Sequence, residues 1–325
     1  MSIFFCTFAA QIMSMEKLLN IVRFFLRLVG YYAVKAKWRK SREMSRWKKE
    51  DIQRMKSIFA EINLLSGWVL PKQEDGCSLT VSLTSHGSRV SKYVTCAIFS
   101  ILQQSKLPNR IVLNLDKNQW SESTLPTPIQ QLQVAGLEVN FCEDVGPHTK
   151  FLPTLEKYPD DVIVTIDDDI FYGDNMLELL WNAYLNSDRK TVICHECKVI
   201  QKDENGRLLP YSQWTAYDAS KDSSAQLSPY GYRGILYPPH IFSEEIFRVD
   251  VYGQLCPKAD DIWFTMMELR DGISVDCVGQ DRNSYYDVDR CNEFEQNGSD
   301  ALHFQNGAQG QNDVQLAALK KYYGI

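Results

Sequence analysis

A chain of 325 residues can form one large domain or two small ones, and 44% hydrophobic and 23% charged residues are ordinary for a globular protein. The formal net charge of −6 argues against general nucleic-acid binding. The sequence has nine cysteines, an odd number, and several of them lie in apolar runs. Both observations favour reduced thiols over a disulfide framework.

The first 60 residues are basic and differ from the remainder. Residues 1–56 hold 13 of the 35 Lys and Arg but 4 of the 41 Asp and Glu, which leaves +9 there and −15 in the rest. On a helix, Arg23 and Arg27 would lie on one face and apolar residues on the other. The sequence has no run of 18 uncharged apolar residues, which a membrane-spanning helix would need. We predict an amphipathic helical extension over 1–60 on an anionic membrane surface, with a helix packed on the globular body as the alternative. This places the chain in the cytoplasm, peripheral at the inner face of the cell membrane.

Strands alternate with helices from residue 79 onward, which predicts an α/β fold with a mixed, mainly parallel sheet flanked by helices. Apolar and β-branched runs predict strands at 79–84, 110–115, 137–142, 161–166, 191–196 and 273–278. The spacing of apolar residues predicts helices at 90–105, 126–135, 148–158, 176–185, 260–270 and 311–323. Residues 210–240 are rich in aromatic and turn residues and predict a long loop with one short strand at 233–237.

Polar residues repeatedly follow the predicted strands. Ligands of such sheets bind beyond the carboxyl ends of the strands. Those ends here carry Thr84-Ser85-His86, Asp116, Glu143-Asp144 and the run Asp167-Asp168-Asp169. This repetition indicates a binding site at one edge of the sheet.

The run of three aspartates within VIVTIDDDIFYGDNM predicts a divalent-cation site. Carboxylate oxygens suit Mg²⁺ or Mn²⁺, which usually take part of their shell from substrate phosphates. On an extended backbone Asp167 and Asp169 would project to the same side. The alternative is a turn cluster before the helix predicted at 176.

Five segments in order carry a family resemblance: TVSLTSHGSRV, ILQQSKLPNRIVLNLD, GPHTKFLPTLEKYPDDVIVTIDDDIFY, GYRGILYPP and ADDIWF. Together they resemble a GT-A-type glycosyltransferase, family-2-like, of the kind found in bacterial capsule and lipopolysaccharide biosynthesis. The resemblance implies a Rossmann-like, nucleotide-sugar-binding GT-A domain over 78–325. It also implies a DxD-type motif that holds Mn²⁺ or Mg²⁺ against the diphosphate of the donor.

The resemblance implies roles for residues that bind the nucleotide-sugar. Thr84, His86 and Arg89 would line the nucleotide pocket, and Asp116 would meet the base or ribose. Lys150 would offer a cation near the diphosphate or ribose. Asp168 is placed with these binding residues.

The resemblance also implies metal ligands and a catalytic base. Asp169 would be the main metal ligand, with Asp167 near the ribose or metal and His303 as a further ligand. Asp261, with its neighbour Asp260, would supply the base that takes a proton from the acceptor hydroxyl. One base opposite the leaving diphosphate implies inversion at the anomeric carbon.

Each assignment has a structural alternative. His86 can be a turn residue, and Asp260 and Asp261 can be acids that merely begin a helix. The pair Cys194 and Cys197 resembles zinc spacing, but no second pair follows, and we favour core packing.

The predicted function is that of a metal-dependent hexosyltransferase. It would move a sugar from a nucleotide-sugar donor to a saccharide or lipid-linked saccharide acceptor in surface polysaccharide synthesis. One alternative is a sugar-phosphate nucleotidyltransferase, which should show a glycine-rich basic loop after its first strand, whereas TSHGSRVSK has one glycine. The other is a non-catalytic protein that binds nucleotide-sugars.

Overall fold

The computed structural model describes residues 42–43, 45–62, 70–72, 77–222, 224–279, 285–289, 306 and 310–325. The chain divides into two compact units, Met1–Ile52 and Gln53–Ile325. The amphipathic stretch with Arg23 and Arg27 lies outside the described residues, so the predicted boundary at residue 60 stays a prediction. Within the described ranges, no helix is long and apolar enough to cross a membrane.

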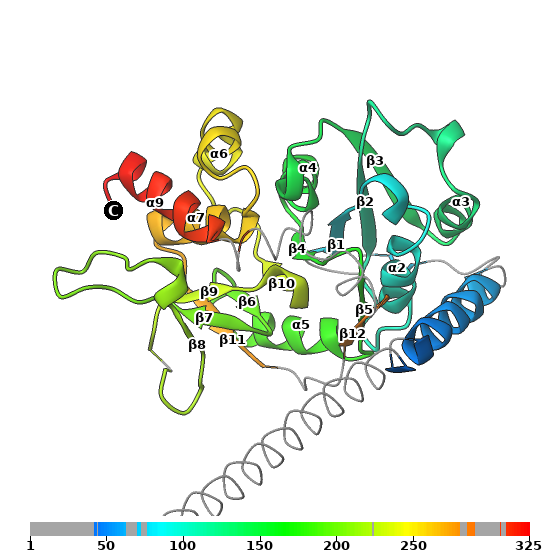
Figure 1. Ribbon diagram of the computed structural model, residues 1–325, viewed down its shortest axis with the longest axis horizontal. Coiled ribbons are helices and arrows are strands. Elements are labelled where there is room, and N and C mark those ends of the chain that lie inside the picture. Colours follow the sequence, from blue (N-terminus) through cyan, green and yellow to red (C-terminus); the bar gives the residue numbers. More distant parts are fainter. Residues whose placement is uncertain are drawn as a thin grey trace, which may run out of the picture. The chain divides into compact units, whose positions relative to one another are not determined.

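A seven-stranded sheet forms the centre of the second unit (Figure 1). Its strands lie in the order β11 (Val275–Cys277), β6 (Val192–Cys194), β10 (Ile235–Tyr237), β4 (Val162–Thr165), β1 (Leu79–Thr84), β2 (Arg110–Asp116) and β3 (Leu137–Cys142). Neighbouring strands pair in parallel, except that β10 runs antiparallel to β4 and β6. The order β3-β2-β1-β4 is that of the first four strands of a Rossmann sheet. The predicted mixed, mainly parallel α/β fold is confirmed.

Helices cover both faces of this sheet (Figure 1). One face packs against α2 (Val94–Leu102), α3 (Thr127–Val134) and α5 (Met176–Asn186). The other packs against α4 (Leu152–Lys157), α6 (Val249–Leu255), α7 (Asp260–Asp271) and α9 (Gln311–Tyr323). Val162 and Val164 of β4 join the first core and Ile163 joins the second. This alternation is the period of a strand buried on both faces.

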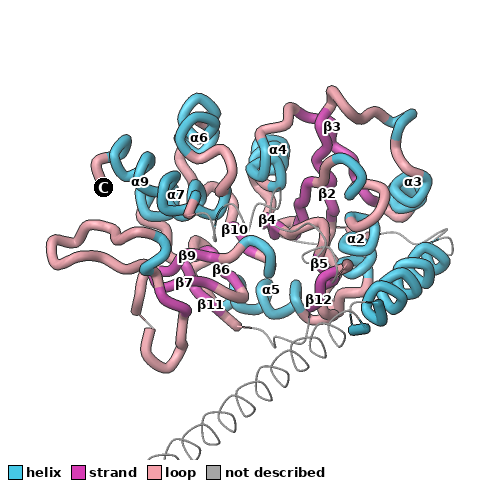
Figure 2. Tube along the Cα trace, viewed as in Figure 1, coloured by secondary structure: helices cyan, strands magenta, loops and turns pink. Residues whose placement is uncertain are grey.

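Two smaller sheets complete the unit. β7 (Cys197–Val199) lies between β8 (Thr215–Ala216) and β9 (Leu227–Pro229), and β5 (Ile170–Tyr172) pairs with β12 (Tyr285–Asp287). Much of the chain between β7 and β10 is loop in Figure 2, as predicted, but β8 and β9 within it were not predicted. Strands of two or three residues are too short to show an alternating pattern. The strand predicted at 191–196 ends at Cys194, where the chain turns into β7.

Candidate functional site

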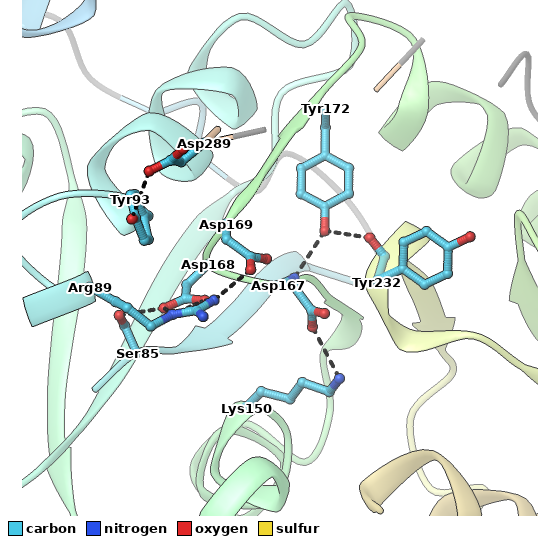
Figure 3. Close-up of polar contacts among 10 residues, drawn as sticks. All are labelled: Ser85, Arg89, Tyr93, Lys150, Asp167, Asp168, Asp169, Tyr172, Tyr232 and Asp289. Atoms are coloured by element: carbon cyan, nitrogen blue, oxygen red, sulfur yellow. Dashed lines mark hydrogen bonds and ion pairs between the residues drawn. The ribbon is translucent and has the colours of Figure 1, made fainter. Parts of the chain in front are cut away.

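The three aspartates lie just after β4, and two of them, Asp168 and Asp169, contact one arginine. Asp168 is buried and accepts hydrogen bonds from Ser85 Oγ at 2.6 Å and Arg89 Nε at 3.0 Å. Arg89 Nη2 lies 2.7 Å from Asp169 Oδ2 (Figure 3). Arg89 therefore bridges two of the three carboxylates and holds the turn that follows β4.

Asp167 contacts a different cation. Its Oδ1 lies 3.2 Å from Lys150 Nζ, and its backbone N–H donates to the Tyr172 hydroxyl at 2.9 Å (Figure 3). The extended backbone that we expected ends at Asp167, because Asp168 and Asp169 form a turn. Asp167 and Asp169 thus meet separate cations.

The Asp169 carboxyl has a raised pKa and is stabilised by nearby positive charge. Burial raises its pKa to about 6; Arg89 opposes this rise, and the negative charges of Asp168 and Asp167 add to it. A carboxyl crowded by two others is stabilised in its ionised form by any cation that approaches it. Its side chain is 34% exposed, so it is accessible to a ligand.

Lys150 joins the aspartates after β4 to the start of α7. Lys150 Nζ lies 2.8 Å from Asp260 Oδ2, in addition to its contact with Asp167. Burial lowers the pKa of Lys150, but Asp167, Asp260 and Asp261 together outweigh burial and raise it well above its usual value. Lys150 is therefore a permanently charged side chain inside the protein.

The two acids that begin α7 have pKa values displaced in opposite directions. Burial raises the pKa of Asp261 to about 7, and the negative charge of Asp260 adds to the rise. Burial also acts to raise the pKa of Asp260, but Lys150 and then His148 lower it below its ordinary value. Two neighbouring carboxyls whose pKa values differ in this way can take different roles in acid–base chemistry.

A polar seam on one face of β1 fixes the backbone of Lys150. Ser82 Oγ donates to the carbonyl oxygen of Lys150 at 2.6 Å and lies 2.6 Å from Thr154 Oγ1. Asn114 Nδ2 donates to the same Thr154 hydroxyl at 2.9 Å. These side chains are fully buried, so each hydrogen bond satisfies a group that would be costly to leave unpaired.

The segment Gly231–Arg233 packs against the acids and Lys150. The backbone N–H of Gly231 donates to Asp261 Oδ2 at 3.2 Å, and the Tyr172 hydroxyl donates to the carbonyl of Tyr232 at 2.9 Å. A Cβ on Gly231 would lie 2.5 Å from Lys150 Nζ and 2.6 Å from Asp261 Oδ1. Any larger residue here would force Lys150 Nζ or Asp261 to move, and both side chains are held by ion pairs or hydrogen bonds.

Replacement of Gly231 by alanine should therefore displace Asp261 and Lys150 and lower turnover. A misplacement near 1 Å in a site of this kind costs on the order of 10²-fold in rate. The measurement is the kcat of Gly231→Ala, followed by release of product. Gly253→Ala is the matched control, because its nearest neighbouring atom would lie 4.0 Å from the new Cβ. Equal kcat values for the two variants would contradict the placement of Gly231 at the reacting centre.

The other nucleotide-binding candidates lie at the carboxyl ends of β1 and β2. Thr84 Oγ1 donates to the carbonyl of Asn114 at 2.9 Å, and His86 is exposed before a short 3-10 turn. Asp116 accepts hydrogen bonds from the backbone of Asn118, which is the main cause of its lowered pKa, and from Gln119. His303 lies outside the described residues. The ligand-binding roles of all four stay predictions.

Two buried groups close to the site were not predicted. His148 stacks on Tyr252 with ring centroids 4.4 Å apart, and burial lowers its pKa to about 4 although the charge of Asp260 acts to raise it. Glu268, further along α7, is buried, and burial followed by the charge of Asp261 raises its pKa to about 8. His148 lies within the segment GPHTKFLPTLEKYPDDVIVTIDDDIFY, but its burial, like that of Glu268, depends on tertiary packing that the sequence pattern does not show.

The pairing of Arg89 with Asp168 predicts a large effect on stability. Arg89→Met leaves the Asp168 carboxylate, 8% exposed, without its cation, and we expect the free energy of unfolding to fall by about 3 kcal/mol. Urea titration at pH 7 measures the change. The double variant Arg89→Met, Asp168→Asn should recover part of the loss, and a double variant less stable than Arg89→Met would contradict the pairing.

The acids after β4 include two carboxylates that stay partly exposed although each lies beside a cation, Asp167 beside Lys150 and Asp169 beside Arg89. Asp167 and Asp169 each expose about one third of the side chain, at 33% and 34%. Across the described ranges, the group of three or more possible ligand residues whose ligand atoms converge within 4.8 Å consists of three cysteines and includes none of these aspartates. Asp167 and Asp169 would thus supply one or two ligands and leave the rest of the shell to phosphate and water, which is the habit of Mg²⁺ and Mn²⁺.

Comparisons with known proteins reach the fold level. No family model and no curated protein matches the chain. It is similar to the crystal structure of 4-diphosphocytidyl-2C-methyl-D-erythritol synthase from Anaerococcus prevotii, with 12% identity over 68% of this chain and all of that one, at a TM-score of 0.43. It is also similar to CMP:2-keto-3-deoxy-manno-octonic acid synthetase complexed with CTP, with 13% identity over 73% of this chain and all of that one, at a TM-score of 0.39.

Proposed function

We propose that the chain is a metal-dependent glycosyltransferase that uses a nucleotide-sugar donor. One observation carries the proposal: the buried Lys150 contacts both the acids after β4 and the acids that begin α7. Its Nζ lies 3.2 Å from Asp167 Oδ1 and 2.8 Å from Asp260 Oδ2. Glycosyl transfer needs two acidic centres of different kinds. One holds a cation against the leaving diphosphate, and the other takes the proton of the acceptor.

In this proposal Asp261 is the catalytic base. It is the member of the α7 pair whose pKa is raised, to about 7, so it can bind a proton near neutral pH. Asp260 stays ionised beside Lys150 and keeps that lysine in place. With the base on the face opposite the leaving group, the sugar would be transferred with inversion.

Asp167 and Asp169 would hold Mn²⁺ or Mg²⁺, and the cation when bound would neutralise the leaving diphosphate as a Lewis acid. Lys150 and Arg89 add positive charge on the same side. Thr84, His86 and Asp116 would line the nucleotide; the proposal is supported by their position at or just after the carboxyl ends of the neighbouring strands β1 and β2.

The acceptor is proposed to be a saccharide or a lipid-linked saccharide in the synthesis of a capsule or lipopolysaccharide. The basic segment over 1–60 would bring the enzyme to the anionic inner surface of the membrane, where such acceptors are assembled. This part of the proposal depends on the charge of +9 in residues 1–56.

A sugar-phosphate nucleotidyltransferase is the second candidate. Arg89 and Lys150 place two cations among the acids, and a nucleoside triphosphate needs such neutralisation. Both cations are already paired with aspartates, however, and the loop after β1 has one glycine in TSHGSRVSK. At 12% and 13% identity, the solved structures named above do not decide between the two functions.

A two-part experiment separates the candidates. Thermal shifts are first recorded with a panel of nucleotide-sugars and nucleoside triphosphates, each with and without Mn²⁺. The stabilising ligand is then incubated with an acceptor or a sugar phosphate, and the released product is identified. Release of nucleoside diphosphate supports a glycosyltransferase, whereas release of pyrophosphate from a triphosphate supports the nucleotidyltransferase. Metal-dependent binding without either product would support the non-catalytic alternative.

A further inference from the structure

Two cysteines that are three residues apart and a third that is distant in sequence converge where β6, β7 and β11 meet. Cys194 is the last residue of β6, Cys197 is the first of β7, and Cys277 is the last of β11. Cys277 and Cys194 are directly paired in register across the parallel strands. Their three Sγ atoms all lie within 4.8 Å of one another. The sequence alone favoured core packing for Cys194 and Cys197, and the third thiol was not foreseen.

We propose that Cys194, Cys197 and Cys277 bind a thiophilic cation, with Zn²⁺ as its physiological occupant. Tetrahedral zinc with Zn–S bonds of about 2.3 Å places sulfurs about 3.8 Å apart, so the thiols need to close by at most about 1 Å. Each S–H bond is replaced by an S–Zn bond and each proton passes to solvent, so that up to three protons are released.

The surroundings of the thiols are compatible with entry and exchange of a metal. Cys194 and Cys197 are buried whereas Cys277 is half-buried, so the group reaches the protein surface on one side. His195 is turned away, because its ring nitrogens lie 3.1 Å from the carbonyl oxygens of Gly279 and Met176. The fourth position is thus left to water or another exogenous ligand.

A metal here would fix the turn that supports the candidate active site. Glu196 lies in the turn between Cys194 and Cys197 and accepts a hydrogen bond from the Tyr232 hydroxyl at 2.8 Å. Its Oε2 also lies 2.6 Å from Arg233 Nε. Tyr232 and Arg233 directly follow Gly231 in the chain. The backbone N–H of Gly231 donates a hydrogen bond to Asp261. The cation would therefore have a structural role, separate from the Mn²⁺ or Mg²⁺ proposed for the aspartates.

The test measures metal uptake and does not depend on the proposed function. The full chain, purified with a reductant, is incubated with Zn²⁺ or Co²⁺ in excess Mg²⁺, which occupies the carboxylate site, and is then dialysed. We expect about one zinc per chain by elemental analysis and a thiolate-to-Co²⁺ charge-transfer band in the ultraviolet. Cys277→Ala should lower both by about tenfold or more, because a site with two thiolates binds far more weakly.

Cys142→Ala is the matched control, because Cys142 is also half-buried but lies on β3 at the far edge of the sheet. It should keep full zinc uptake and the charge-transfer band. The proposal is overturned if the wild-type chain binds no zinc and gives no thiolate band with Co²⁺. It is equally overturned if Cys142→Ala loses as much metal as Cys277→Ala does. A disulfide among Cys194, Cys197 and Cys277, found by mass spectrometry, would also overturn it if reduction restores no zinc uptake. The wild-type measurement stands even where Cys277→Ala does not fold.

Discussion

Asp261→Asn should lose between 10² and 10⁴-fold in kcat while it still binds the nucleotide-sugar donor, because general-base catalysis contributes about that much. Asparagine preserves the size of the side chain and can still accept the N–H of Gly231, which is 3.2 Å away. It cannot take a proton from an acceptor hydroxyl. Donor affinity by calorimetry and kcat by release of nucleoside diphosphate separate the two effects.

The pH dependence gives a second measurement of the same residue. Because the pKa of Asp261 is raised to about 7, log(kcat/KM) should rise with pH and level off near pH 7. For stability the sign is opposite. The folded state holds this proton more tightly than the unfolded state, whose ordinary pKa is 3.8, so the contribution of Asp261 is favourable at low pH and is lost as the pH rises from about 4 to 7. Asp261→Asn should therefore be more stable than the wild type at pH 8.

Asp250→Asn is the control that separates catalysis from helix capping. Asp250 lies in the first turn of α6, as Asp261 lies in the first turn of α7, but it is exposed and paired with Arg248. If Asp261 only favours the start of its helix, both variants should lose a few tenths of a kcal/mol and keep full activity. Undiminished transfer by Asp261→Asn would place the base elsewhere and refute our assignment.

Much of the fold is predictable because most strands are short, continuous apolar runs that end in polar residues. β1 and β3 occur with the predicted boundaries, and β2 extends one residue further, to Asp116. The missed strands β5, β7, β8, β9 and β12 have two or three residues each. Their pairing depends on contacts between segments rather than on a pattern within one of them.

The candidate site was predictable in its residue types but not in its pairing. Strand ends carry the acids, so Asp167 and Asp169 stand out in sequence. Lys150 contacts both Asp167, which is 17 positions away in the sequence, and Asp260, which is about 110 positions away. This arrangement forms only when the chain folds. The requirement for glycine at position 231 has the same origin, because it reflects the approach of Lys150 and Asp261. The thiol trio is a third case, in which β11 brings Cys277 to β6.

Lys150 links these observations because it lies among three carboxylates. It is buried, its Nζ contacts Asp167 and Asp260, and its backbone carbonyl is held by Ser82. Removal of one partner from a buried ion pair is more costly than loss of a surface pair, because the remaining charge is left uncompensated. The second large effect is therefore expected at this residue.

Lys150→Met should lower the free energy of unfolding by about 3–5 kcal/mol at pH 8 and weaken donor binding, because methionine keeps the apolar stem and removes the charge. The raised pKa of Lys150 means that its contribution in the wild type is fully present below pH 10.5 and is lost only as the pH rises through the folded-state value. In the variant the acids can take up protons as the pH falls, so the difference from the wild type should shrink towards pH 4. Urea titrations at several pH values measure this trend.

Lys157→Met is the matched control, because Lys157 is 45% exposed and pairs with Glu138 at the surface. A surface pair contributes about 0–1 kcal/mol, so this variant should unfold almost as the wild type does at every pH. A loss for Lys150→Met as small as that for Lys157→Met would mean that Asp167 and Asp260 do not depend on Lys150 for compensation. A large loss that stayed constant from pH 8 to pH 4 would point to packing of the lysine stem rather than to its charge.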